Sequence, residues 1–456
     1  MTSLFPSSSA EKKTLIPKPS MDSLIKKQKL YPSSINPFYK LPHETIVEIL
    51  SRLPIRSVIQ FTFTCKTLYP LSADPLLVKL HLSRSENSYL IIHSKNPLKT
   101  HLYFLQLSDQ KVYEFETPFA SSMSEFSIIG SSNGLLYLID SLFPQHTYLY
   151  NPFTREYFEI PIKHENCGQI VIHGFGFDPV GCDYKVVKIA YCRDRYTYHV
   201  KDEYQGHIRP LPSIIEVYSL RRNSWTYNGI VPYILETWSS PGVLVNNRLH
   251  WVTVWVKKPN WQCHKRLIVS YNLVDDTIDE MACPCSNSNY IFDRLIISHL
   301  AVLDKRLCAS LPMLDRDAFD VWVMREYGVD ESWVKEYSIC INFPWSLIRH
   351  IEPPHHIWQN RFGKNMVKVL GILESGEVIL EYVGERLVAY DPCNKSSKEL
   401  KYNGMPRIYQ AMFHIGSLVS PHLVFIRSII HIWINRVRTL MKQSMRHHST
   451  VSMGQR

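Results

Sequence analysis

The sequence predicts an α + β multidomain protein, with a small N-terminal helical module, a large all-β domain of β-propeller type and a C-terminal amphipathic helix. Two patterns support this: apolar residues fall at helical spacing over residues 41–82, and short apolar and aromatic runs recur from about residue 88 to 420. Hydrophobic residues at 45% and charged residues at 20% describe a folded chain. The expected boundaries are 1–36 for a disordered basic arm, 37–85 for the helical module, 86–420 for the β domain and 421–456 for a basic amphipathic tail.

The first 36 residues are rich in Ser, Pro and Lys and carry no periodic apolar pattern. Such a composition favours a flexible arm, because it offers too little apolar surface to form a core. Lys26-Lys27-Gln28-Lys29 is a candidate nuclear-import signal. A solubilising linker is the favoured interpretation of the same segment.

The helical module begins near Leu41. Pro42 suits the first turn of a helix, and Pro54 ends that helix because the residue before a proline avoids helical geometry. A second helix is expected from Ile55, a third with Thr64 as its N-cap, and a fourth after Asp74. The first helix carries apolar residues on one face, at Ile46, Ile49, Leu50 and Leu53.

About forty residues are too few to bury all the apolar side chains of this module. The surplus comprises Leu41, Ile49, Leu53, Ile55 and Val58. Two interpretations remain open at this point: these residues pack on the domain that follows, or they form a docking surface for a partner.

The β domain consists of strand-like runs separated by Pro, Gly, Asn and Asp. The first runs are SYLIIHS, HLYFLQL, KVYEFE, NGLLYLID and TYLYNPFT. At about 45–50 residues for a four-stranded blade, the roughly 330 residues of this region predict six or seven propeller blades. Gly174 and Gly176 are expected to let the backbone turn tightly while Phe175 and Phe177 fill the core, and Asp178-Pro179 begins a turn.

The net charge of +10 resides at the two ends of the chain. Residues 1–40 hold seven lysines against two acidic residues, and residues 421–456 hold six basic residues and no acidic one, which leaves the body at −1. A nearly neutral body argues against a nucleic-acid cleft, so no nucleic acid is expected as a partner. Contact of the basic ends with nucleic acid or a membrane surface remains an alternative.

No motif of an enzyme or a cofactor site occurs in the sequence: there is no nucleophile elbow, phosphate-binding glycine loop or zinc helix. Cys263, His264, Cys283 and Cys285 have metal-ligand chemistry, but Cys-Pro-Cys does not fit common zinc spacing, and buried structural thiols are favoured. We therefore expect no catalytic residues, no metal and no cofactor. Ten scattered cysteines without a signal peptide favour a reducing compartment, cytoplasmic and/or nuclear.

The tail after Pro421 places apolar residues on one helical face, at Leu423, Ile426, Ile430, Trp433, Val437 and Leu440. Arg427 and the polar residues that follow argue against a transmembrane segment. Docking on protein is favoured over a membrane surface.

The run LPxExxxEILxRLPxxSxxxFxxxCKxLxxL, from Leu41 to Leu71, resembles an F-box, the helical module that binds the Skp-type adaptor of cullin-based ubiquitin ligases. It departs from the usual plant pattern at Thr64, Leu68 and Pro70. The resemblance implies an adaptor-binding set comprising Leu41, Pro42, Ile46, Ile49, Leu50, Leu53, Pro54, Ile55, Val58 and Cys65.

The β domain resembles the plant F-box-associated domain through an ordered set of segments that includes NPFTREYFEIP, HGFGFDPVGCDYKVVKI, EVYSLRRNSW, PGVLVNNRLHWV and RLVAYDP. The resemblance implies a kelch-like propeller that captures a protein. Together the two resemblances imply a non-catalytic substrate-recognition subunit of an SCF-type ubiquitin ligase, with the adaptor, through it a cullin, and an unknown protein substrate as partners. A scaffold that binds without promoting degradation is the alternative.

Overall fold

The computed structural model describes residues 41–64, 69–85, 89–94, 101–107, 111–121, 123, 125–143, 146–161, 170–191, 213–231, 233–235, 241–256, 267–284, 299–313, 318–340, 367–382, 386–406, 408 and 410–425. The predicted basic arm, Cys65 and most of the predicted tail lie outside these residues. Of the tail, a helical stretch at residues 421–425 is described. No described helix has the length and apolar character needed to cross a membrane.

The described part of the N-terminal module contains three α-helices and one 3₁₀ helix: α2 (His43–Leu50), α3 (Ile55–Thr64), η3 (Tyr69–Ala73) and α4 (Pro75–Arg84). Asp74 caps α4, because its Oδ1 accepts hydrogen bonds from Leu76 N at 2.7 Å and Leu77 N at 3.1 Å. The expectation that Thr64 begins a third helix is wrong, since α3 continues to Thr64. The next described element is the 3₁₀ helix η3, which contains Pro70, and residues 65–68 between the two lie outside the described residues.

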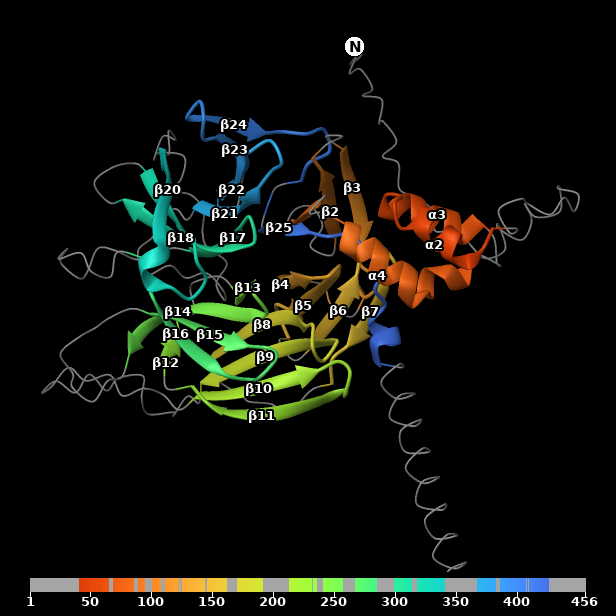
Figure 1. Ribbon diagram of the computed structural model, residues 1–456, viewed down its shortest axis with the longest axis horizontal. Helices are drawn as coiled ribbons and strands as arrows, with labels where there is room; N and C mark the ends of the chain where they lie inside the picture. Colours follow the sequence, from red (N-terminus) through yellow and green to blue (C-terminus); the bar gives the residue numbers. More distant parts are fainter. Residues whose placement is uncertain are drawn as a thin grey trace, which may run out of the picture.

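The β domain is a propeller of six antiparallel blades arranged as a ring (Figure 1). This confirms the propeller and fixes the number of blades. From the channel outward, blade 1 is β25 (Gln410–His414), β1 (Tyr89–His93), β2 (His101–Gln106) and β3 (Lys111–Glu116); blade 2 is β4 (Phe126–Ser132), β5 (Leu135–Asp140), β6 (Thr147–Asn151) and β7 (Glu156–Glu159); blade 3 is β8 (Ile170–Asp178), β9 (Asp183–Tyr191), β10 (Ser213–Ser219) and β11 (Ser224–Ile230).

The last three blades complete the ring. Blade 4 is β13 (Val243–Val245) and β12 (Tyr233–Leu235), both paired with β14 (Arg248–Val256), then β15 (Leu267–Asn272) and β16 (Ile278–Ala282); blade 5 is β17 (His299–Leu303), β18 (Arg306–Met313), β19 (Ala318–Met324) and β20 (Trp333–Cys340); blade 6 is β21 (Val367–Ile372), β22 (Val378–Tyr382), β23 (Arg386–Asp391) and β24 (Ser396–Leu400). A short 3₁₀ helix, η5 (Asp330–Ser332), precedes β20.

The ring is closed by β25, a strand from the end of the domain that pairs with β1 from its beginning. Gln410 joins this strand to blade 2, because its Oε1 accepts a hydrogen bond from Ile128 N at 3.0 Å and its Nε2 donates to Ile128 O at 2.5 Å. The segment that follows β25 is also bound to blade 2, because Asn151 Nδ2, at the end of β6, donates to Ser417 O at 2.9 Å and to Val419 O at 2.8 Å. Both ends of the domain are therefore fixed to the same pair of blades.

The two faces of the ring differ in the length of their connections. Since the strands of each blade alternate in direction, the turns between first and second strands and between third and fourth strands share one face. On that face, β4–β5, β13–β14 and β17–β18 are joined by two-residue turns, Asn133-Gly134, Asn246-Asn247 and Asp304-Lys305, all with positive φ. The strand ends that border the longest stretches of sequence between strands, residues 192–212, 283–298 and 341–366, lie at the opposite face.

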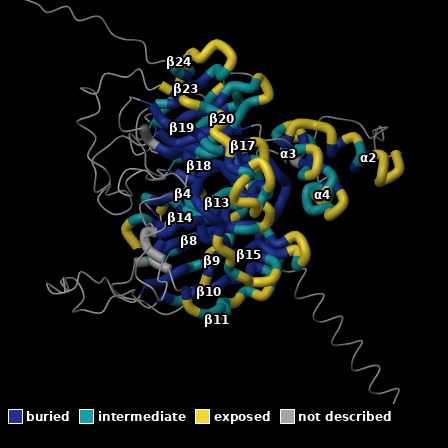
Figure 2. Tube along the Cα trace, turned by 60° about the vertical axis from the view of Figure 1, so that its left-hand side comes forward, coloured by how far each residue is buried: buried dark blue, intermediate teal, exposed yellow. Residues whose placement is uncertain are grey.

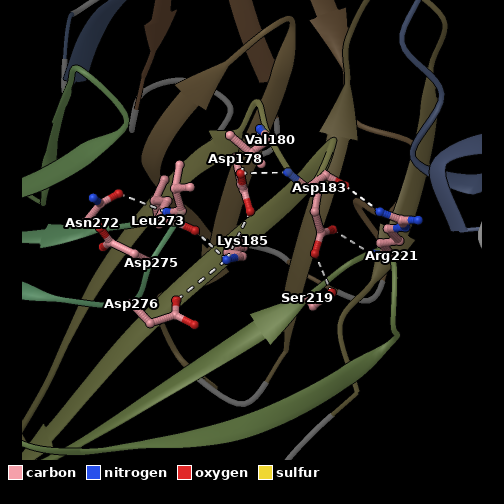
Figure 3. Close-up of polar contacts among 12 residues, drawn as sticks. Asp178, Val180, Asp183, Lys185, Ser219, Arg221, Asn272, Leu273, Asp275 and Asp276 are labelled. Carbon is pink, nitrogen blue, oxygen red and sulfur yellow. Dashed lines mark hydrogen bonds and ion pairs between the residues drawn. The ribbon is translucent and has the colours of Figure 1, made fainter.

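Blades 3 and 4 are joined by a buried polar cluster (Figure 3). Lys185 Nζ donates to the carbonyl oxygen of Leu273 and lies 3.2 Å from Asp178 Oδ2 and 3.6 Å from Asp276 Oδ1. Asp178 also holds the turn predicted after β8, because its Oδ1 accepts from the backbone N–H of Gly181 at 2.9 Å. Lys185 is 8% exposed, so its charge is stabilised by these partners rather than by water.

Candidate functional site

The helical module is the candidate site, and polar side-chain contacts join its helices to one another. His43 Nε2 lies 2.9 Å from Asp74 Oδ2, at the N-terminal ends of α2 and α4. At their C-terminal ends, Arg84 Nη2 donates to Glu48 Oε2 at 2.9 Å. Arg52 and Arg84 together hold the pKa of the Glu48 carboxyl below its ordinary value. The two helices therefore run side by side in the same direction.

A buried histidine joins α4 to the segment between α2 and α3. His81 Nε2 donates to Leu53 O at 3.1 Å, and Ser85 Oγ lies 3.1 Å from the other ring nitrogen. Burial lowers the pKa of His81, so the ring is neutral and can donate through one nitrogen and accept through the other. This contact holds the sharp bend at Leu53-Pro54.

The structure divides the predicted adaptor-binding residues into an exposed group and a buried group. Leu41 is 39% exposed, Ile49 41% and Leu53 36%, and Pro42 and Pro54 are also exposed. The buried group, all at 8% exposure or less, comprises Ile46, Leu50, Ile55 and Val58. The first interpretation, packing on the domain that follows, is therefore confirmed for Ile55 and Val58, whereas the exposed group stays a predicted docking surface.

The buried group belongs to a core that the module shares with blades 1 and 2. Ile55 packs so closely on Gly416 that a Cβ at that glycine would lie 2.7 Å from Ile55 Cγ2. Beside it, the Arg56 guanidinium lies 3.5 Å from the centre of the Tyr113 ring, a cation–π contact with blade 1. Figure 2 shows α3 on the propeller side of the module and α2 farther out.

Two of the exposed residues, Leu53 and Pro54, lie toward the propeller. They line a cavity of about 1270 Å³ that extends from the module to the inner strands, where Lys368 and Met412 contribute to its wall. Leu41, Pro42 and Ile49 do not line this cavity. Leu41, Pro42 and Ile49 are therefore the predicted adaptor-binding residues that are both exposed and outside this cavity.

Leu76 is an exposed apolar residue of the module that sequence reasoning did not select. It is 43% exposed and lies in the first turn of α4, two residues after the cap Asp74. The sequence signal for this exposure was the Asp74-Pro75 pair, which marks the start of α4 and so places Leu76 in its first turn. Side chains in a first turn have fewer helical neighbours to cover them. Its side chain adds apolar area to the exposed surface of the module.

The metal-type residues of the sequence fall only partly within the described residues. In that part of the chain, no group of three or more His, Cys, Asp or Glu residues could hold a metal ion. Cys283, one of the four metal-type residues singled out in the sequence, is buried in the core between blades 4 and 5. Cys263, His264 and Cys285 lie outside the described residues.

Comparison with known proteins identifies the family. The family model for the F-box domain matches residues 38–80, and the model for the F-box associated beta propeller domain matches residues 81–424. The chain is a plant F-box protein with an F-box-associated β-propeller. The helical module is its F-box, which confirms both resemblances. F-box domains generally bind Skp-type adaptors in SCF complexes, and proteins of this architecture are generally non-catalytic receptors.

Curated relatives extend over most of the chain. F-box protein At3g07870 from Arabidopsis thaliana is 36% identical over 83% of this chain and 91% of its own length. F-box protein CPR1 from the same plant is 27% identical, covering 83% and 88%. The F-box/kelch-repeat protein At3g23880 from A. thaliana is 26% identical, covering 66% and 80%. This last name agrees with the expected kelch-like character of the propeller.

Proposed function

We propose that this F-box protein is the substrate-recognition subunit of an SCF-type ubiquitin ligase. The F-box docks on the Skp-type adaptor, and through it on a cullin, while the propeller holds a target protein for ubiquitination and proteasomal degradation. The chain supplies proximity rather than bond-making chemistry, because it raises the effective concentration of the target near the conjugating enzyme.

The observation that supports adaptor docking is the exposure of Leu41 and Ile49, which lie outside both the shared core and the cavity wall. Both are large apolar side chains that stay about two-fifths exposed on the module that the F-box family model matches, so they are accessible to another protein. We propose the exposed group, centred on these two residues, as the contact with the adaptor, and the buried group as its support.

The shared core of F-box and propeller supports a fixed geometry between adaptor and target. Since Ile55, Arg56 and Gly416 connect the two domains directly, rotation of one against the other would expose apolar surface. The F-box contributes Arg84 and Ser85 to a cavity wall shared with the turn residues Asp304-Lys305, so it adjoins the face with the short turns. We propose that the target binds toward the opposite face, where the strands that border the long connections end.

We place this activity in the cytoplasm, the nucleus or both. The five cysteines described in the structure, Cys182, Cys283, Cys308, Cys340 and Cys393, are all free thiols. Free thiols on an exposed surface persist in a reducing compartment, which is where a cullin-based ligase would use this receptor.

The proposal is tested by affinity capture followed by reconstitution. A Leu41→Ser/Ile49→Ser variant should retain targets without passing them to the ligase, so proteins enriched on it become candidate substrates. Each candidate is then incubated with the wild-type chain, a Skp-type adaptor, a cullin, a conjugating enzyme and ubiquitin. Ubiquitin transfer that requires the wild-type chain is expected. The non-degradative scaffold would be favoured by a retained partner that the complete complex does not ubiquitinate. The cellular level of that partner would also stay unchanged when the proteasome is inhibited.

A further inference from the structure

The outer strands of the six blades are not equally protected against pairing with another chain. Five of them carry charged residues that discourage edge-to-edge association: Lys111, Glu114 and Glu116 on β3; Glu156 and Glu159 on β7; Asp279 and Glu280 on β16; Lys335 and Glu336 on β20; Lys398 and Glu399 on β24. The outer strand of blade 3, β11, reads SWTYNGI and carries none. Within the described residues, β11 pairs only with β10, and it forms the outer edge of its blade in Figure 1.

The apolar side chains of β11 lie on one face of the strand. Trp225, Tyr227 and Ile230 stand opposite Tyr218, Glu216 and Ile214, which alternate regularly along β10. A β-bulge at Asn228-Gly229 inserts one extra residue, and this brings Ile230 to the same side as Tyr227. The ladder is regular from Ser224 to Tyr227.

Two of the three side chains on this apolar face of β11 are largely exposed to solvent. Tyr227 is 59% exposed and Ile230 62%. Trp225 is held in place, because its Nε1 donates to Pro161 O at 2.8 Å. An uncharged edge with a fixed aromatic residue and two exposed apolar side chains offers both main-chain hydrogen bonds and side-chain contacts.

We propose that β11 is a docking edge for an extended segment of a partner protein, which adds to blade 3 as a fifth strand. The segment would carry apolar residues at alternating positions, opposite Tyr227 and Ile230, and an acidic residue at the end beside Ser224. That last requirement follows from Arg222, an exposed residue of the β10–β11 turn.

The size of the edge favours a single segment over a second copy of this chain. Seven residues extend about 23 Å, and a strand with its side chains is about 10 Å tall. Two such edges side by side would bury roughly 500 Å² in all, well below the roughly 1,200 Å² of a stable specific interface. A short extended segment, in contrast, needs only this length to form its ladder.

This inference concerns how a target is held and therefore rests on the proposed receptor function. Its test uses the full-length chain without an adaptor, so its failure leaves adaptor binding untouched. The probe is a fluorescein-labelled peptide in which threonine and valine alternate over seven residues between two terminal glutamates, so that either strand direction places a carboxylate near Arg222. The matched control peptide has two adjacent central amides N-methylated, which removes main-chain donors.

Binding is followed by fluorescence anisotropy, and hydrogen exchange locates the peptide. We expect saturable binding that slows amide exchange over Ser224–Ile230, and no binding of the methylated peptide. Tyr227→Ser with Ile230→Ser should weaken binding by about tenfold, and Arg222→Ala should weaken it by a smaller factor. The same change at Val334, which is 43% exposed on the charged strand β20, should have no effect.

Three results would overturn the proposal. These are no saturable binding of the unmodified peptide, equal binding by the folded double variant, and protection located away from β11. A concentration-dependent dimer of the wild-type chain that the double variant abolishes would instead assign the edge to a second copy. Thermal unfolding of each variant confirms that it is folded, which is expected because both side chains are mostly in solvent.

Discussion

The exposed group on the F-box gives a prediction that separates docking from folding. Replacing Leu41 and Ile49 together by serine should weaken binding to a Skp-type adaptor while leaving the chain folded. Both side chains lie outside the core that the F-box shares with the propeller, and surface substitutions of this kind usually change the free energy of unfolding by less than about 0.5 kcal/mol.

The expected loss of binding follows from the exposed area. Complete burial of a leucine or isoleucine side chain contributes about 1.5–3 kcal/mol, and these two residues retain about two-fifths of their surface for a partner. Area alone therefore gives about 1 kcal/mol for each residue, and a central position in the interface raises this to about 2 kcal/mol. The double variant should bind the adaptor about 30-fold to 1000-fold more weakly.

The assay is isothermal titration of the adaptor into each purified full-length variant. Val334→Ser is the matched control, since Val334 is similarly exposed but lies on blade 5, away from the F-box. Ile55→Ala is the contrasting variant: that side chain is 3% exposed, so its truncation should destabilise the fold by about 2–5 kcal/mol. Unchanged adaptor affinity in a folded Leu41→Ser/Ile49→Ser variant would refute the assignment of the exposed group.

Three further predictions concern stability. Asn151→Ala removes both hydrogen bonds to the segment after β25 and leaves Ser417 O and Val419 O without this donor. Chemical denaturation should show a free energy of unfolding that is lower by about 2 kcal/mol or more. An unchanged denaturation midpoint would contradict this account of ring closure. Lys185→Met leaves Asp178 buried without its cation and should lower the free energy of unfolding by about 3–5 kcal/mol, measured by thermal unfolding. The control Lys185→Arg retains the charge and should lower it by less. Burial lowers the pKa of His173, His299 and His414 to about 3 each, so these rings stay neutral in the folded protein but take up protons below about pH 6.5 when it unfolds. The contribution of these neutral histidines to the free energy of unfolding should therefore be fully present above about pH 6.5 and decrease steadily toward about pH 3. A melting temperature that stays constant from about pH 7.5 to about pH 5 would argue against this.

Local pattern was sufficient for the class of fold and for most of its elements, but it placed the start of a helix wrongly at Thr64. Helical spacing placed Ile46, Ile49 and Leu50 on α2, and alternating apolar runs marked the strands that became blades. The number of blades could not be settled in the same way, because one blade takes its inner strand, β25, from more than three hundred residues beyond β1. No local rule identifies such a long-range pair.

The division of the F-box surface was equally beyond local pattern. Ile49 and Ile55 are chemically alike and only six residues apart, yet one is 41% exposed and the other 3%. Ile55 is packed against Gly416, which lies at the far end of the propeller sequence. A local sequence pattern cannot show a contact between residues so far apart. Periodicity predicts that a face is apolar, but the tertiary fold decides which part of that face stays available.

The β11 edge shows a third kind of limit. Its lack of charge was readable in the sequence, but Ile230 shares a face with Trp225 and Tyr227 only because of the bulge at Asn228-Gly229. Its significance also required knowing which strands form the outer edges of the blades.

The central claim is that the F-box of this chain seats a Skp-type adaptor while it is packed against its own propeller. The most direct measurement is size-exclusion chromatography with light scattering of the wild-type full-length chain mixed with purified adaptor. We predict a stable complex of one chain with one adaptor, with the melting temperature of the propeller unchanged or raised. Two separate peaks at concentrations where both proteins are folded would contradict the claim.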